Sequence, residues 1–209
     1  MKKYFYHHNK IRLTLESYNL VREIKKRLLF NINKLLVNLN IKYTIACGNL
    51  IEYERGSPIY HDDDIDIRVD FRDWEKWVSY LSNINGSDIE NNLTFKRVQQ
   101  DKNGLWYHVF LLKYDNINLI KGLNVGIDLV ISTECAGGFW KKYDINFDDL
   151  RSISYLDINT FAPNINDTKK VLQMDYGPNY IIPNYAPYTI ISSRLPQIIN
   201  NLKIGTPDF

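Results

Sequence analysis

The chain has 209 residues, of which 44% are hydrophobic and 24% charged, a balance typical of one globular domain with a core of its own. Its formal net charge of +2 excludes the large basic field that would by itself indicate nucleic-acid binding. No apolar run approaches the length of a membrane span, so we expect none.

The predicted secondary structure mixes helices, single strands and a hairpin. Apolar residues recur at spacings of three and four in the helices and alternate with polar residues in the strands. In chain order the predicted elements are a helix at 14–39, a short strand at 42–47, a helix at 48–54, a strand at 64–69, a helix at 73–81, strands at 93–99, 105–114, 123–131 and 153–161, a helix at 167–174, and a Pro/Tyr-rich tail at 176–209. Thr14 and Asp73 are expected to cap helices, Asn40 and Gly56 to end them, and 101–104 to form a hairpin turn. We therefore expect an α+β fold rather than a doubly wound α/β fold.

An acidic run stands directly before the predicted strand at 64–69. Four carboxylates occupy residues 62, 63, 64 and 66. Like charges at this spacing raise one another's pKa values unless a cation lies among them. In an extended conformation Asp62, Asp64 and Asp66 point to one face of the strand, and Asp63 points to the other. Three carboxylates on one face are half of a site for a divalent metal ion.

A later apolar strand contains a single acid, Asp128, which needs a partner because an unpaired charge is costly inside a protein. Grouping Asp128 with Asp64 and Asp66 around Mg²⁺ explains all three charges and leaves coordination positions for phosphate oxygens. The alternative interpretation is a solvated acidic turn at 62–66, with Asp128 paired to an arginine such as Arg68.

Residues 48–66 resemble the signature of the LicD family, which also includes fukutin and fukutin-related protein. The matching positions, in order, are Gly48, Leu50, Arg55, Ile59 and the acidic run, with one residue fewer before the acids. The strand with Asp128 and the pair Tyr176-Gly177 also resemble later elements of the family. The sequence departs from the signature at Glu52, where the family has its second glycine, and at His61, where it has tryptophan.

The resemblance implies a nucleotidyltransferase-like fold, a mixed β-sheet flanked by helices. It implies a transferase that moves a phospho-alcohol, such as phosphocholine or ribitol phosphate, from a CDP-activated donor to a glycan acceptor. Carried over by position, Asp64 and Asp66 bind Mg²⁺ (or Mn²⁺), with Asp62 as a further ligand. Asp128 is the third carboxylate and the base that acts on the acceptor hydroxyl.

On the donor side, the resemblance places Gly48 and Asn49 against the phosphates. The missing side chain of Gly48 also fits this role physically, because phosphate can then approach the N–H groups at a helix start. Arg55 is expected to neutralise phosphate charge. His61 has two interpretations: it contacts phosphate or shuttles a proton, or it is a local charge partner of the acids.

Two further functions use the same residues. One is a nucleotidyltransferase that moves a nucleoside monophosphate from an NTP to a small molecule, a protein or an RNA end. The other is a catalytically inactive protein that binds nucleotide and metal, which the departure at Glu52 keeps open. Aromatic residues of the predicted strand at 105–114 are interpreted as packing residues, so we expect no stable nucleic-acid partner.

The cysteines bear on the compartment. Cys47 and Cys135 are far apart in the sequence and neither has a CxxC partner. This argues against a zinc site and a disulfide framework and favours a reducing environment. We therefore expect a soluble, cytoplasmic protein.

Overall fold

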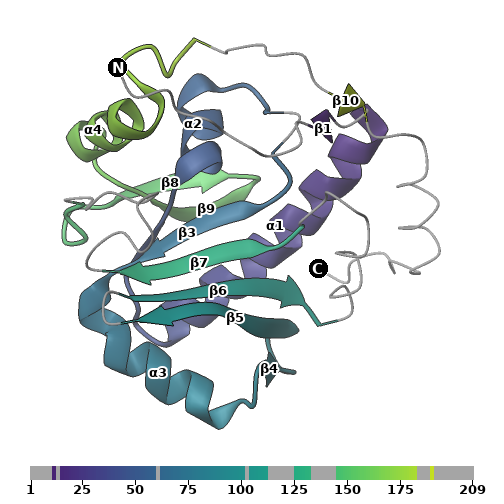
Figure 1. Ribbon diagram of the computed structural model, residues 1–209, viewed down its shortest axis with the longest axis vertical. Coiled ribbons are helices and arrows are strands. Elements are labelled where there is room, and N and C mark those ends of the chain that lie inside the picture. The colour runs from purple at the N-terminus through teal and green to yellow at the C-terminus, as the bar shows by residue number, and fades with distance from the viewer. Residues whose placement is uncertain are drawn as a thin grey trace.

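A computed structural model describes residues 11–12, 15–59, 62–101, 104–112, 125–132, 145–182 and 189–190. A six-stranded mixed sheet lies at the centre, and helices flank it (Figure 1). The predicted α+β class, with a mixed sheet flanked by helices, is confirmed. The predicted cap Thr14, His61, Cys135 and most of the tail after residue 182 lie outside the described residues.

The observed elements follow the predicted order. The helices are α1 (Leu15–Asn38), α2 (Cys47–Arg55), the 3-10 helix η1 (Phe71–Asp73), α3 (Trp74–Asn83) and α4 (Ile165–Tyr176). The strands are β1 (Ile11–Arg12), β2 (Tyr43–Ile45), β3 (Ile65–Val69), β4 (Ser87–Asp88), β5 (Leu93–Asp101), β6 (Gly104–Leu111), β7 (Ile127–Ser132), β8 (Arg151–Tyr155), β9 (Ile158–Ala162) and β10 (Thr189–Ile190). The prediction of one strand at 153–161 was wrong, because the chain reverses there into the β8–β9 hairpin. Its turn residues Leu156 and Asp157 have φ values of 53° and 61°.

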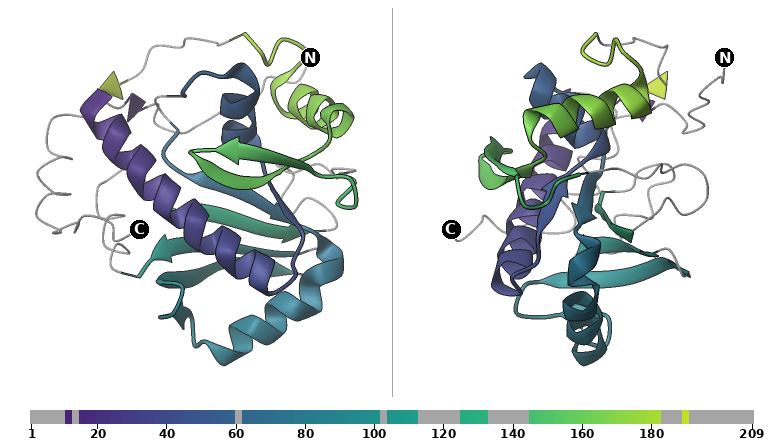
Figure 2. Two further views of the ribbon diagram at one scale, coloured as in Figure 1. Left: turned by 180° about the vertical axis from the view of Figure 1, so that it is seen from behind. Right: turned by 90° about the vertical axis from the view of Figure 1, so that its left-hand side faces the viewer.

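Helix α1 crosses one face of the sheet, as the view from behind shows (Figure 2). Its apolar stripe is buried: Val21, Leu28 and Ile32 are 0% exposed. The helix ends at Asn38, and two residues later Asn40, the predicted stop, has a φ of 50° that turns the chain so that it enters β2. One lysine of this helix is buried, since Lys25 is only 3% exposed.

The central sheet has the order β2-β3-β7-β6-β5-β4. Strands β3 and β7 run parallel, and the other neighbours are antiparallel. Ile65 and Ile67 of β3, with Ile127 and Leu129 of β7, are fully buried in the same core as the stripe of α1. Because side chains alternate between faces, residues between them on β3 and β7 point away from α1.

The long hairpin β5–β6 confirms the predicted turn, since Asp101 pairs with Gly104. Helix α3 packs beside it through Trp77, which is 0% exposed. The ring centroid of Trp77 lies 5.6 Å from that of Phe95 and 6.2 Å from that of Tyr107. Tyr107, in the predicted strand at 105–114, is therefore a packing residue, as predicted.

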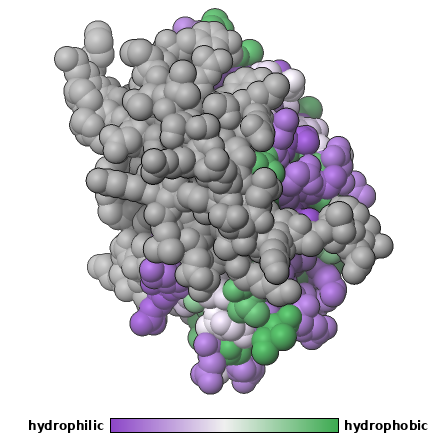
Figure 3. Space-filling model, turned by 90° about the vertical axis from the view of Figure 1, so that its right-hand side faces the viewer, coloured by the Kyte–Doolittle hydropathy of each residue, from purple (hydrophilic) through white to green (hydrophobic). Residues whose placement is uncertain are grey.

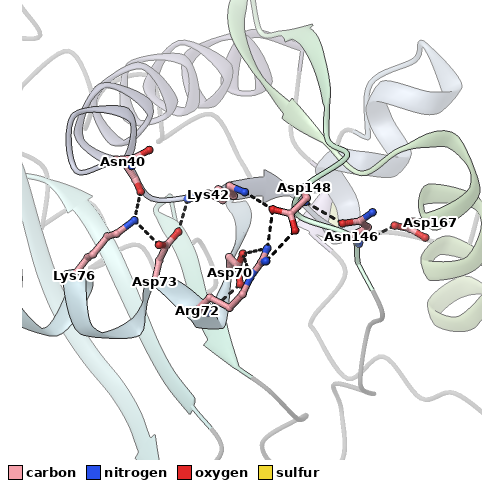
Figure 4. Close-up of polar contacts among 9 residues, drawn as sticks. All are labelled: Asn40, Lys42, Asp70, Arg72, Asp73, Lys76, Asn146, Asp148 and Asp167. Atoms are coloured by element: carbon pink, nitrogen blue, oxygen red, sulfur yellow. Dashed lines mark hydrogen bonds and ion pairs between the residues drawn. The ribbon is translucent and has the colours of Figure 1, made fainter.

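A chain of polar contacts ties the start of α3 to distant segments (Figure 4). Asp73 occupies the predicted cap position, but its carboxylate makes no capping bond. It accepts instead from the backbone N–H of Lys42 at 2.8 Å and pairs with Lys76 at 2.6 Å. Arg72 bonds Asp148, which connects η1 to the segment before β8. These contacts position the ends of α1 and α3 against β2.

The described surface carries its hydrophobic residues in separate places. Hydrophilic residues make up most of the coloured surface in Figure 3, and hydrophobic residues form small spots among them. The large apolar side chains that are exposed are spread over α1, η1, α3, α4 and the segments between elements: Phe30, Val37, Phe71, Val78, Ile89, Ile165, Ile181 and Ile182. Within the residues that the structure describes, no helix has the length and apolar character needed to cross a membrane.

Candidate active site

Three of the predicted carboxylates come together at the two parallel strands. Asp64 stands immediately before β3, Asp66 is its second residue, and Asp128 is the second residue of β7. The register pairs Asp66 with Asp128. Neighbouring residues in register present their side chains on the same face of a sheet, here the face opposite α1. All three side chains are half-buried.

The carboxylates perturb one another strongly. The loss of surrounding water, and then the charge of Asp66, raises the pKa of Asp64 well above its ordinary value. The same loss of water, and then the charge of Asp128, raises the pKa of Asp66, while Arg68 opposes the shift. The cluster therefore favours a bound proton or a bound cation over three free negative charges.

Asp62 is directed elsewhere, to a lysine from α1. Its Oδ2 lies 2.7 Å from the Nζ of Lys25, which also donates to the backbone carbonyl of Asp62 at 3.2 Å. Burial opposes the charge of Lys25, but Asp62, Tyr155 and Glu52 together outweigh this effect, and the pKa of Lys25 is raised. Asp62 precedes β3, so the extended conformation that would align it with Asp64 and Asp66 does not reach back to it.

Gly48 and Asn49, at the start of α2, hold the acidic loop. A Cβ on Gly48 would overlap the Asp62 carboxylate, so only glycine permits this close approach. Asn49 is 0% exposed. Its amide donates to Asp62 Oδ2 at 3.0 Å and to the carbonyl of Asp64 at 3.1 Å, and its Oδ1 accepts from the N–H of Asp66 at 2.6 Å. The predicted contact of these two residues with donor phosphates stays a prediction.

Arg55 and Glu52 make internal contacts. Arg55 ends α2 and its Nε donates to the carbonyl of Tyr180 at 2.8 Å, which fixes the chain after α4. Glu52, at the departure from the LicD signature, is 9% exposed and accepts from the N–H of Ile59 at 3.2 Å. Burial raises its pKa, and Lys25 partly opposes the shift. Both side chains thus stabilise segments around α2.

The described partner of Asp128 is a histidine. His108 pairs with Asp128 across the antiparallel strands β6 and β7, and its Nδ1 lies 2.5 Å from Asp128 Oδ1. Arg68 was the alternative partner for Asp128. In the structure the Nη2 of Arg68 lies 4.0 Å from the sulfur of Cys47. Sequence reasoning missed His108 because nothing local to either strand reveals which residues pair across a sheet.

The donor set suits a hard divalent cation, because Asp64, Asp66 and Asp128 offer only carboxylate oxygens. Within the described residues, however, no three His, Cys, Asp or Glu side chains converge closely enough to hold a metal ion. Ligation by these three residues would require their side chains to turn toward a common point. Burial and neighbouring charges raise the pKa values of Asp64 and Asp66, so a cation bound between these carboxylates would offset the repulsion that such a movement costs.

No protein-family model matches the sequence, and no curated protein sequence matches it. Among solved structures, the chain is similar to the lincomycin-bound crystal structure of the lincosamide antibiotic adenylyltransferase LnuA. The two chains are 14% identical, the match covers 81% of this chain and 97% of that chain, and the TM-score is 0.42. This level of similarity does not assign a donor or an acceptor to this chain.

Proposed function

We propose that the chain is a Mg²⁺-dependent transferase that acts at a phosphorus atom of a nucleotide-activated donor. The observation that carries this proposal is the pairing of Asp66 with Asp128, next to Asp64, on one face of the sheet. Burial and the neighbouring carboxylates raise the pKa values of Asp64 and Asp66, and a bound cation would relieve this cost. When bound, Mg²⁺ would neutralise charge on the donor phosphates and lower the pKa of the acceptor hydroxyl.

In this proposal Asp64 and Asp66 hold the metal ion, and Asp128 is both the third ligand and the base for the acceptor hydroxyl. Asp62, which was predicted as a fourth ligand, instead fixes the acidic loop through its bond to Lys25. This assignment rests on the 2.7 Å contact and on the burial of the lysine.

For the donor phosphates, the start of α2 at Gly48 is the better candidate on this helix. Arg55 stands seven residues later, about 10 Å along the axis, and its guanidinium is bonded to the carbonyl of Tyr180. His61, outside the described residues, keeps its two interpretations.

For the transferred group, we propose a nucleoside monophosphate from an NTP, passed to a small-molecule acceptor. Arg55, which matches the LicD signature, has an internal partner here, and so have Asn49 and Glu52, the residue at which the sequence departs from the signature. What supports the proposal is therefore the carboxylate cluster, which nucleotidyl transfer also requires. Transfer of a phospho-alcohol from a CDP-activated donor to a glycan is the second candidate, which the motif match from Gly48 to Asp66 favours.

The test is a thermal-shift and turnover screen with Mg²⁺ and ATP, GTP, CTP, CDP or CDP-alcohols. Stabilisation by an NTP with release of pyrophosphate supports the first candidate, and stabilisation by cytidine diphosphate compounds supports the second. Nucleotide binding without any turnover supports the catalytically inactive protein. If no nucleotide raises the melting temperature with Mg²⁺ present, the proposed function is wrong.

The carboxylates are tested with Asp64→Asn and Asp66→Asn, with Asp63→Asn as the matched control in the same loop. Both site variants should lose Mg²⁺-dependent nucleotide stabilisation and turnover. Their metal-free melting temperatures should not fall, because each substitution removes a repelling charge. The control should retain Mg²⁺ dependence. Full activity in Asp64→Asn or Asp66→Asn would refute the metal assignment.

A further inference from the structure

His108 lies beside the carboxylates of the proposed site but has no role in it so far. It stands directly opposite Asp128 on β6, and the two side chains meet at 2.5 Å between Nδ1 and Oδ1. An ionised carboxylate only accepts hydrogen bonds, so Nδ1 carries the hydrogen and donates it. His108 is half-buried, like Asp128, so both side chains reach the same partly solvated face of the sheet.

The imidazole ring is supported by its own strand. Phe110, two residues along the same face of β6, is 5% exposed, and its ring centroid lies 6.0 Å from that of His108 at an interplanar angle of 41°. Phe110 in turn presses on Gly126, where a Cβ would lie 2.7 Å from Cε1 of the ring. Gly126 precedes Asp128 by two residues, so Phe110 lies close against the chain that carries Asp128. The position of His108 is therefore defined by packing as well as by its hydrogen bond.

We propose that His108 is the positioning residue for Asp128: its Nδ1–H holds one carboxylate oxygen so that the other is presented to the metal ion. This inference rests on the proposed function, because it concerns the same site. A carboxylate that is already held by a hydrogen bond loses less rotational freedom when it binds an ion. Hydrogen-bond partners of metal ligands orient the ligand in this way, and their loss weakens metal binding.

The experiment measures Mn²⁺ binding to the metal-free full-length protein without nucleotide, so that its readout does not depend on turnover. Free Mn²⁺ is followed by electron paramagnetic resonance during titration. His108→Phe keeps an aromatic ring of similar size but removes the donor, and should raise the Kd for Mn²⁺ by about 10-fold to 100-fold. His108→Asn places an amide N–H near the position of Nδ1 and should restore most of the affinity.

Tyr107→Phe is the matched control on β6, because it removes a polar atom on the opposite face of the strand. It should bind Mn²⁺ as the wild type does. Melting temperatures in the presence of EDTA establish that each variant is folded. Should His108→Phe fail to fold, His108→Gln replaces it, since its amide lies farther from the backbone, near the position of Nε2. His108→Gln should bind Mn²⁺ more weakly than His108→Asn.

The outcomes separate the two proposals. If the wild type binds Mn²⁺ and folded His108→Phe binds it equally well, the positioning role is wrong while the metal site stands. If His108→Asn is as weak as His108→Phe, the hydrogen bond is not what His108 contributes, and the inference is also overturned. If the wild type binds no Mn²⁺, the proposed function fails and the role of His108 fails with it.

Discussion

Replacing Lys25 by methionine should destabilise the fold strongly. Methionine is close to lysine in length and apolar, so it fills the same space on α1 but removes the charge. Lys25 is 3% exposed and the Asp62 side chain is 14% exposed. Without the lysine, Asp62 becomes a nearly buried carboxylate that keeps the hydrogen bond from the amide of Asn49 at 3.0 Å.

The magnitude follows from the geometry of this pair. Removing one partner of a buried ion pair costs about 3 to 5 kcal/mol. The lower end applies here, about 3 kcal/mol, because Asp62 keeps the bond from Asn49 and some contact with solvent. For a chain of this size, such a loss lowers the melting temperature by about 6 to 12 °C. Because the folded-state pKa of Lys25 is raised, its contribution is fully present below the ordinary lysine pKa of about 10. It is lost only as the pH rises above that value.

Urea denaturation followed by tryptophan fluorescence measures this loss, because Trp77 is fully buried. Lys26→Met is the matched control: the neighbouring lysine pairs with Asp157, whose side chain is 70% exposed, so its removal should change little. Equal and small losses of stability in the two variants would refute the reasoning. In an Asp62→Asn background, Lys25→Met should cause only a small loss of stability, because no charged carboxylate is left without its lysine. That result would support the reasoning.

Two further predictions concern the same loop. Gly48→Ala should cost about 1 to 3 kcal/mol of stability, because its Cβ would overlap the Asp62 carboxylate. This cost should largely disappear in an Asp62→Ala background. If urea denaturation shows that the costs of the two substitutions simply add, the overlap is contradicted. Because the folded-state pKa values of Asp64 and Asp66 are raised, the metal-free protein should lose stability as the pH rises above about 4, the ordinary aspartate pKa. Mg²⁺ competes with those protons, so the increase in melting temperature that it causes should grow between about pH 5 and about pH 8, and a constant increase would contradict a site at these carboxylates.

Local patterns were sufficient for most of the fold. The spacing of apolar residues predicted α1, and Asn40 marked its end because it tolerates the left-handed conformation. The turn at 101–104 was predictable because its glycine and polar residues favour a hairpin. The turn at Leu156 and Asp157 was not, since leucine rarely adopts the positive φ that Leu156 has here. Its local cost is offset by tertiary contacts: Leu156 is 5% exposed, and Asp157 bonds Lys26 at 3.0 Å.

The sequence by itself determined that carboxylates gather before one strand and that Asp66 alternates with the buried residues Ile65 and Ile67. A strand reverses its side chains every residue, so this assignment of faces is local. Only the tertiary structure decided that Asp128 lies beside Asp66, that His108 faces Asp128, and that Lys25 binds Asp62. Partners across a sheet depend on strand order and register, which follow from the packing of the whole core against α1 rather than from any one segment.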